Sequence, residues 1–322
     1  MRGSGDIRRL AGGAISLVAV AGCALWASKQ EAPSFPTGAE NWALLGAALA
    51  VYAIATLVRG WRWHMILRHA HIHHHQADAY GLTVVGYMGN TVLPARGGEL
   101  LRIVFMSERS DARRREVFGT ILPERFLDAG ALAFVFCLLT AAGVAGTPLG
   151  QTPALAAAAI LVIAVLGLFT YLRLRIAGRM QSFADRLRPV LRASRTLLTP
   201  IGAGLAVVSI GIWLCEGVVF WCVAGSVDVS ISLMEALFVI VLGSFLALVP
   251  SAPGYVGTYD AALLFGLHHL GVQGGAALGC ALLFRFVAFV PITVAGAGLV
   301  IGRYGGLRAL RSSKEPALAG QG

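Results

Sequence analysis

Charged side chains stand inside long apolar stretches of this sequence, where a charge is costly unless it pairs or faces a polar cavity. Arg125 and Arg285 each lie within such a stretch, and Glu124 and Asp128 lie within one turn of Arg125. Guanidinium groups offer planar sets of donors that fit phosphate oxygens. We therefore expect a cationic, phosphate-binding site built from arginines and the carboxylates that orient them. Its candidate residues are Arg59, Arg96, Glu99, Arg102, Glu124, Arg125, Asp128, Glu216, Asp260 and Arg285.

The same arginines have a second interpretation. Arg125 and Arg285 could form salt bridges between helices with Glu216, Glu99 or Asp260, in which case they would serve packing only. The two interpretations are compatible, because a carboxylate that orients an arginine at one stage of a transport cycle can give way to a substrate at another. Both therefore stand at this point.

Other site chemistries find little support in the residue pattern. No nucleophile with a base and an acid, no glycine loop after a strand and no quartet of metal ligands is visible. The five cysteines fall in apolar stretches without a Cys-x-x-Cys spacing, which indicates core packing. The histidine run from His69 to His75 follows Trp61, Arg62 and Trp63, and an interfacial belt in contact with lipid headgroups explains it more simply than a metal site. We expect no metal, no cofactor and no enzymatic activity.

The elements that must position these residues are membrane helices. Hydrophobic residues make up 57% of the chain and charged residues only 13%, too few to cover a water-soluble globule. A spanning helix needs roughly 20 apolar residues. Six stretches are long enough: 10 to 28, 41 to 58, 117 to 143, 153 to 172, 200 to 224 and 276 to 301.

The net charge of +10 follows the expected membrane topology and does not indicate nucleic-acid binding. With the N-terminus in the cytoplasm, nearly all Lys and Arg residues fall in cytoplasmic segments, and the loops at 144 to 152, 225 to 232 and 271 to 275 contain none. This bias matches the positive-inside rule, so both termini are expected in the cytoplasm. Residues 173 to 195, with seven arginines among apolar residues, are expected to form an amphipathic helix on the inner leaflet.

Two further apolar segments are interrupted by proline and glycine. Residues 79 to 93 run into Pro-Ala-Arg-Gly-Gly-Glu, and residues 233 to 249 into Pro-Ser-Ala-Pro-Gly-Tyr-Val-Gly. Each arm is too short to cross a bilayer, and interrupted backbone at membrane depth needs protein or a polar cavity around it. We therefore expect two re-entrant helical hairpins, one from each side of the membrane, with kinked interfacial helices as the alternative. The expected tip residues are Pro94, Gly97, Gly98, Pro250, Pro253, Gly254 and Gly257.

The two hairpins belong to an internal repeat. The pattern Gly-x-x-Leu-x-x-Arg-Phe at 119 to 126 recurs at 279 to 286, and a hairpin proline precedes it in both copies. The two units, about 41 to 145 and 200 to 305, have opposite expected orientations, as in transporters whose site lies near the midplane. The expected fold is one all-α integral membrane domain over 1 to 322, with about six full transmembrane helices, two re-entrant hairpins and an inverted repeat.

Four short motifs resemble those of the lysylphosphatidylglycerol synthase transmembrane-domain family, whose members are often called flippase-like. The motifs occur in the family's order, within a resemblance that covers roughly residues 10 to 305. They are the segments 94 to 102, 124 to 128, 253 to 257 and 284 to 286. The residues that match the family's pattern are Gly98, Glu99, Arg102, Glu124, Arg125, Asp128 and Arg285.

The resemblance implies translocation of a phospholipid or a lipid-linked precursor between leaflets. Asp260 stands where the family usually has glutamate, and Phe284 stands where it usually has tyrosine. Related domains are fused to aminoacyl-phosphatidylglycerol synthetases, and we expect no such synthetase domain here.

The leading expectation is a lipid translocase for an anionic phospholipid or a polyprenyl-type lipid precursor in a bacterial cell (inner) membrane. One alternative is an accessory subunit or membrane enzyme of lipid modification, with Glu99 or Asp260 as base. A second alternative is a gradient-driven small-solute transporter. Membrane lipids and a lipid-modifying enzyme are the expected partners, nucleic acid is not, and no oligomeric state is predicted.

Overall fold

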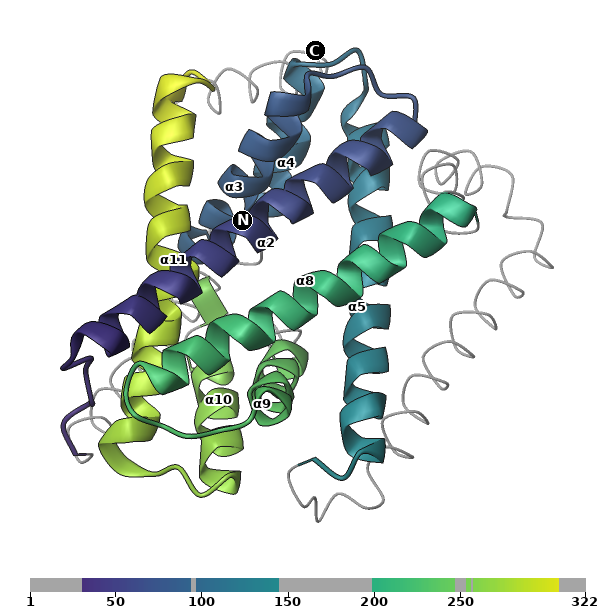
Figure 1. The fold of residues 1–322 in the computed structure, drawn as a ribbon. Helices are drawn as coiled ribbons and strands as arrows, with labels where there is room; N and C mark the ends of the chain where they lie inside the picture. Colours follow the sequence, from purple (N-terminus) through teal and green to yellow (C-terminus); the bar gives the residue numbers. More distant parts are fainter. Residues whose placement is uncertain (1–30, 94–96, 145–198, 247–252, 256, 307–322) are drawn as a thin grey trace, which may run out of the picture. The chain divides into compact units, whose positions relative to one another are not determined.

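The computed structural model describes residues 31–93, 97–144, 199–246, 253–255 and 257–306, and these residues are helical throughout apart from their connections. Two predicted spans (10 to 28 and 153 to 172) and the predicted amphipathic segment (173 to 195) lie outside them. The eight described α-helices and one 3₁₀ turn are α2 (Ala39–His69), α3 (Gln76–Val92), α4 (Gly97–Glu108), α5 (Arg114–Ala141), α8 (Pro200–Gly225), α9 (Leu233–Leu246), η2 (Pro253–Tyr255), α10 (Thr258–His269) and α11 (Gly274–Gly302) (Figure 1).

Three of the described helices are long and apolar enough to cross a membrane. They are α2 with 31 residues, α8 with 26 and α11 with 29, and they cover three of the predicted spans. Helix α5 covers a fourth and has 28 residues, but the charged residues in its interior set it apart by composition. The prediction of an all-helical membrane protein is confirmed for the described residues, with three helices of membrane-spanning length.

Helix α2 continues eleven residues beyond the predicted span and ends only at His69. Arg62 and Trp63 are fully buried in this extension, and Trp63 donates a hydrogen bond from Nε1 to Thr120 Oγ1 at 3.1 Å. These two side chains therefore contact protein groups, and the predicted interfacial belt cannot include them. The predicted span stops early because charged residues interrupt the apolar sequence. In the fold, protein groups form hydrogen bonds with these residues, so the helix continues.

The described residues group into two compact units. The first takes its residues from Met1–Leu57, Gly81–Arg102 and Leu214–Gly322, and the second from Val58–Tyr80 and Ile103–Trp213.

In the first unit, both predicted breaks separate short helices. Helices α9 and α10 pack side by side, with Gly243 against Tyr259 and Gly266 against Val239 (Figure 1). In the other hairpin, Gly98 on α4 lies so close to the carbonyl oxygen of Gly86 on α3 that a Cβ would overlap with it. Small residues thus let the two arms of each hairpin approach closely, as is usual between membrane helices.

The break before α10 lies against the end of α3. Gly254 has φ +66° and ψ +16°, a left-handed conformation that glycine adopts readily. A Cβ built on it would lie 3.4 Å from the carbonyl oxygen of Thr91, so the residues that flank the two breaks are neighbours. Helix α11 also reaches α3, because Gly296 lies against the side chain of Met88.

The second unit has a core of large side chains from α2, α4 and α5. Its fully buried residues include Trp63, Ile66, Phe105, Met106 and Ile121. Because this core surrounds the last turns of α2, the polar side chains of those turns must find partners within the unit.

Candidate functional site

A buried arginine joins three helices of the second unit. Arg62 of α2 has no exposed surface, and its Nη1 donates to Asp128 Oδ1 at 2.7 Å and to Ser209 Oγ at 2.6 Å. Its Nη2 lies 3.5 Å from Glu124 Oε1, and the Glu124 side chain is also fully buried. Glu124 and Asp128 are four residues apart on α5, so a helix places both carboxylates on one face.

Two further arginines act on Asp128. Arg125 Nη1 lies 3.8 Å from Asp128 Oδ2, a looser contact, and the Arg125 side chain is 28% exposed. Arg59 also acts electrostatically on Asp128. We call the set Arg59, Arg62, Glu124, Arg125, Asp128 and Ser209 the Arg62 cluster.

The Arg62 cluster gathers three guanidinium groups around two carboxylates. Guanidinium groups gathered in this way offer hydrogen-bond donors to an anionic group. The cation best placed to receive it is Arg125, because it is the more exposed partner and its contact with Asp128 is longer than a hydrogen bond.

A second pair of charges holds the break in the first unit. Arg285 of α11 donates from Nε and Nη2 to the two carboxylate oxygens of Asp260, with 2.9 Å between Nη2 and Oδ2. Its Nη1 donates to the carbonyl oxygen of Gly254 at 3.2 Å. Asp260 Oδ2 in turn accepts the N–H of Gly257 at 3.0 Å, which caps the start of α10. The guanidinium also lies 5.2 Å from the ring centroid of Phe289.

Three aromatic side chains of the first unit pack against one another. Phe284 is buried, stacks on Tyr259 with 6.2 Å between ring centroids, and meets Phe220 edge-on at 5.4 Å. Glu216, another predicted site residue, is buried on α8. Tyr259 interacts electrostatically with Glu216, Arg285 and Asp260, so these charged residues lie in its neighbourhood.

The structure brings together two subsets of the predicted site residues. Arg59, Glu124, Arg125 and Asp128 meet in the Arg62 cluster, and Asp260 meets Arg285, one of the pairings that the sequence left open. Arg125 has Asp128 beside it, which was not among the three carboxylates named for it.

The remaining predicted residues lie at other positions of the described helices or outside the described part of the chain. Arg102 is buried on α4 with its side chain against Gly86, and Glu99 is half-buried one turn earlier. Gly97 and Gly98 begin α4, while Pro253, Gly254 and Gly257 form the break before α10. Pro94, Arg96 and Pro250 lie outside the described residues.

Sequence reasoning missed Arg62 and Ser209. Two carboxylates at an i, i+4 spacing on one apolar helix need more positive charge than one neighbouring arginine supplies. This imbalance of charge on one helix could have predicted another buried arginine. Arg62 also follows Arg59 by three positions, which places both on one side of a helix.

Comparison with known proteins shows a match to the family described as lysylphosphatidylglycerol synthase TM region over residues 10–296. The resemblance inferred from the four motifs is thereby confirmed. Glycosyltransferase AglD of Haloferax volcanii is 24% identical over 91% of this chain and 54% of its own length. A UPF0104 membrane protein of Methanothermobacter thermautotrophicus is 21% identical over 74% of this chain and 79% of its own.

A phosphatidylglycerol lysyltransferase of Staphylococcus epidermidis is 34% identical over 34% of this chain, a stretch that makes up 12% of that protein. The chain thus spans about half the length of the glycosyltransferase and a small part of the lysyltransferase.

Proposed function

Since the chain belongs to the family of the lysylphosphatidylglycerol synthase TM region, a family of multi-pass membrane proteins, we propose that it is a lipid translocase. Its substrate is an anionic phospholipid or lipid-linked precursor, which it moves between the two leaflets. It catalyses no chemical step, and its driving force is a gradient or the lipid's own distribution.

The observation that carries this proposal is the Arg62 cluster. Buried charge within a membrane protein marks a substrate or ion pathway by default, and this cluster gathers three guanidinium groups around two carboxylates. A lipid phosphate supplies one negative charge and two non-bridging oxygens that can accept a pair of hydrogen bonds from a planar guanidinium. The proposed site therefore matches its substrate in charge and in hydrogen-bonding geometry.

We assign different tasks to the two arginines next to Asp128. Arg62 is held by two carboxylates and a hydroxyl and stays in place as the fixed centre. Arg125 has the longer contact and more exposure, so it exchanges Asp128 for the lipid phosphate. Arg285 is committed to Asp260 and Gly254 and keeps the second break in shape.

The architecture that we propose for this function has about six spans, two re-entrant hairpins, inverted repeats and both termini in the cytoplasm. The arms of the hairpins have 17, 12, 14 and 12 residues, each shorter than the roughly 20 residues that a span needs. The contact between Gly254 and Thr91 supports hairpins whose tips meet. Interrupted backbone that is packed in this way can lie at membrane depth.

Proteoliposomes with fluorescent lipid in both leaflets test the proposal. The protein is expected to make inner-leaflet phosphatidylglycerol accessible to an impermeant quencher, and Arg125→Gln is expected to slow this exchange at least tenfold. Arg114→Gln is the matched control, because Arg114 is exposed at the start of the same helix. Unchanged exchange in Arg125→Gln, or no exchange of any anionic lipid, contradicts the proposal.

A second candidate function follows from the relatives whose names denote transferases. On this view the chain is the membrane part of a lipid-modifying system, as an accessory subunit or an enzyme. Product formed from a lipid and an activated donor by the purified protein alone would favour this candidate. A reaction that requires an added soluble enzyme would favour the accessory role.

A further inference from the structure

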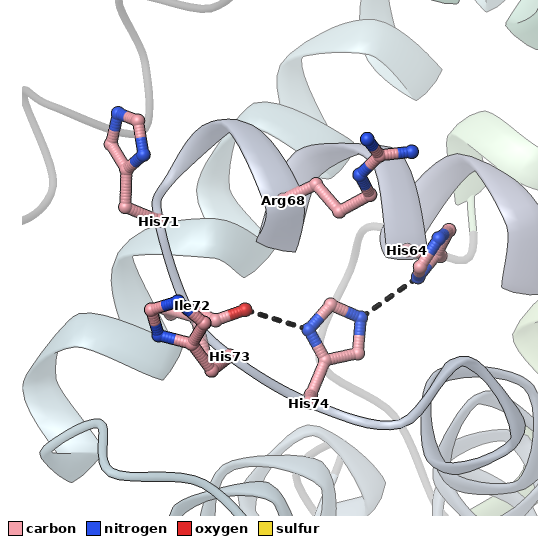
Figure 2. Close-up of a pocket in the computed structure, with 6 residues that line it drawn as sticks. All are labelled: His64, Arg68, His71, Ile72, His73 and His74. Atoms are coloured by element: carbon pink, nitrogen blue, oxygen red, sulfur yellow. Dashed lines mark hydrogen bonds between the residues drawn. The ribbon is translucent and has the colours of Figure 1, made fainter.

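A histidine-rich pocket lies at the end of α2 in the second unit. It has a volume of about 490 Å³ and is lined by His64, Arg68, His71, Ile72, His73 and His74 (Figure 2). None of these residues belongs to the Arg62 cluster, and the proposed translocation makes no use of them. The pocket therefore needs an explanation of its own.

Hydrogen bonds fix the protons on two of the histidines. His74 Nδ1 lies 2.8 Å from the carbonyl oxygen of Ile72, and because a carbonyl only accepts, Nδ1 must carry a proton. The Nε2 of neutral His74 is then an acceptor, so His64 Nδ1, at 2.9 Å, donates to it. Figure 2 shows His74 bridging Ile72 and His64 in this way. The remaining basic nitrogen of the pair is His64 Nε2.

A further proton can enter this pair without breaking a hydrogen bond. His64 protonated at Nε2 still donates from Nδ1 to His74, so the geometry is the same in both charge states. The charge added there faces Arg68, which follows one turn later on α2, and the imidazole of His74. Two exposed histidines, His71 and His73, complete the titratable groups of the lining.

The lining contains a guanidinium and four imidazoles but no carboxylate. Asp78, which follows on α3, is engaged with Arg109 at 3.6 Å. A divalent metal ion would therefore place its charge near Arg68 with no anion to balance it. Among the described residues, no group of three His, Cys, Asp or Glu side chains is arranged to hold a metal.

We propose that this pocket is a proton-dependent binding site for a phosphate group, either in a lipid headgroup or as free phosphate. An oxyanion would accept hydrogen bonds from Arg68 and from protonated His64. Binding and protonation then favour each other, because the anion offsets the repulsion between the charged imidazole and Arg68. Affinity for an oxyanion consequently rises as the pH falls and His64 takes up its second proton.

Calorimetric titration of the full chain in neutral detergent tests the site. Inorganic sulfate is the first probe, because its charge does not change between about pH 5.5 and about pH 8, the range in which histidine titrates. We expect saturable binding that is at least tenfold tighter at the lower pH. Arg68→Gln and His74→Gln are each expected to weaken it at least tenfold. His75→Gln is the matched control, since His75 is an exposed neighbour outside the lining and should leave binding unchanged.

Two competition arms separate the possible sources of the phosphate. Displacement of sulfate by short-chain phosphatidic acid, and not by inorganic phosphate, assigns the site to a lipid headgroup, whereas the reverse assigns it to free phosphate. Absence of saturable sulfate binding at both pH values overturns the proposal. So does equal binding in Arg68→Gln, or binding of Zn²⁺ that His74→Gln abolishes while sulfate does not bind. These measurements involve no transport, so their failure is distinct from failure of the translocase proposal.

Discussion

Arg285 donates hydrogen bonds from Nε and Nη2 to both carboxylate oxygens of Asp260, and from Nη1 to the carbonyl oxygen of Gly254. One side chain of α11 thereby fixes the start of α10 and the irregular backbone before it. The same carboxylate caps the N–H of Gly257, so the pair satisfies backbone polar groups that a broken helix exposes. The second break is thus stabilised by a specific ion pair, besides the packing of glycines.

Removal of the charge on Asp260 should destabilise the protein. In Asp260→Asn the guanidinium of Arg285 loses its ion pair in a mostly buried place, with side chains that are 20% and 24% exposed. Breaking a fully buried ion pair usually costs about 3–5 kcal/mol. Because this pair is partly exposed, we expect a smaller loss of about 2–4 kcal/mol in the free energy of unfolding. Thermal unfolding in detergent, followed by tryptophan fluorescence, measures it.

Two further variants make this result specific. Asp260→Glu keeps the charge and introduces the residue usual in the family, so it should retain most of the stability. Asp111→Asn removes an exposed carboxylate and should have little effect. Equal stability of Asp260→Asn and the unmodified protein would show that the pair contributes nothing to folding.

Arg62 and Arg125 should differ in what their loss affects. Arg62→Gln leaves the buried carboxylates of Glu124 and Asp128 without their main cation and should cost about 3–5 kcal/mol of unfolding free energy. Arg125→Gln should cost less than about 1 kcal/mol, because its contact is long and part-exposed, yet should slow lipid exchange.

A compensating set of substitutions checks the cause. Combining Arg62→Gln with Glu124→Gln and Asp128→Asn removes Arg62 together with both carboxylates that it contacts, and should recover most of the lost stability, but not the transport. If stability stays low, the loss in Arg62→Gln comes from packing around the side chain and not from the unpaired carboxylates.

Gly254→Ala should disturb the second break through its backbone. Its φ of +66° is unfavourable for alanine by about 1–2 kcal/mol. Space is not the obstacle, since the nearest atom to an added Cβ is at 3.4 Å. Gly46→Ala is the control, because Gly46 is helical with nothing within 4 Å and should gain stability or stay unchanged. Equal melting temperatures for both variants would argue against the left-handed conformation.

Cysteine labelling tests whether the first hairpin returns to the side from which it enters. In a version without native cysteines, Gln76→Cys and Glu108→Cys mark the outer ends of α3 and α4, and both positions are exposed. An impermeant thiol reagent should modify both from the same side of sealed vesicles. Labelling from opposite sides would mean that residues 76 to 108 cross the membrane once, and the hairpin interpretation would fail.

The length of each apolar stretch and the positions of proline and glycine predicted the helices well where no charged residue interrupted the stretch. The spans predicted at 200 to 224 and 276 to 301 correspond to Pro200–Gly225 and Gly274–Gly302. Both breaks appear where proline and glycine cluster. These features are local, since chain length against bilayer thickness and the limits on φ decide them without reference to distant residues.

Partner choice could not be predicted in the same way. The sequence predicts the end of α2 too early, because Arg59 and Arg62 resemble the charged residues that follow a membrane span. In the structure, Asp128 and Ser209 accept hydrogen bonds from Arg62, so the helix can continue. Likewise, several carboxylates could have paired with Arg285, and only the approach of α10 to α11 selects Asp260. Pairings of this kind depend on tertiary contacts that one sequence does not encode locally.

Ser209 adds a mechanical constraint to the second unit. Its hydroxyl accepts a hydrogen bond from Arg62 and donates one to the carbonyl of Leu205 on its own helix. If α8 moved along α2 by one turn, the guanidinium of Arg62 would lose its hydrogen bond to Ser209. A similar movement of α5 would separate Arg62 from both carboxylates. During any transport cycle, the parts of these three helices that surround Arg62 should therefore travel as one rigid body, and the moving hinges should be sought elsewhere in the chain.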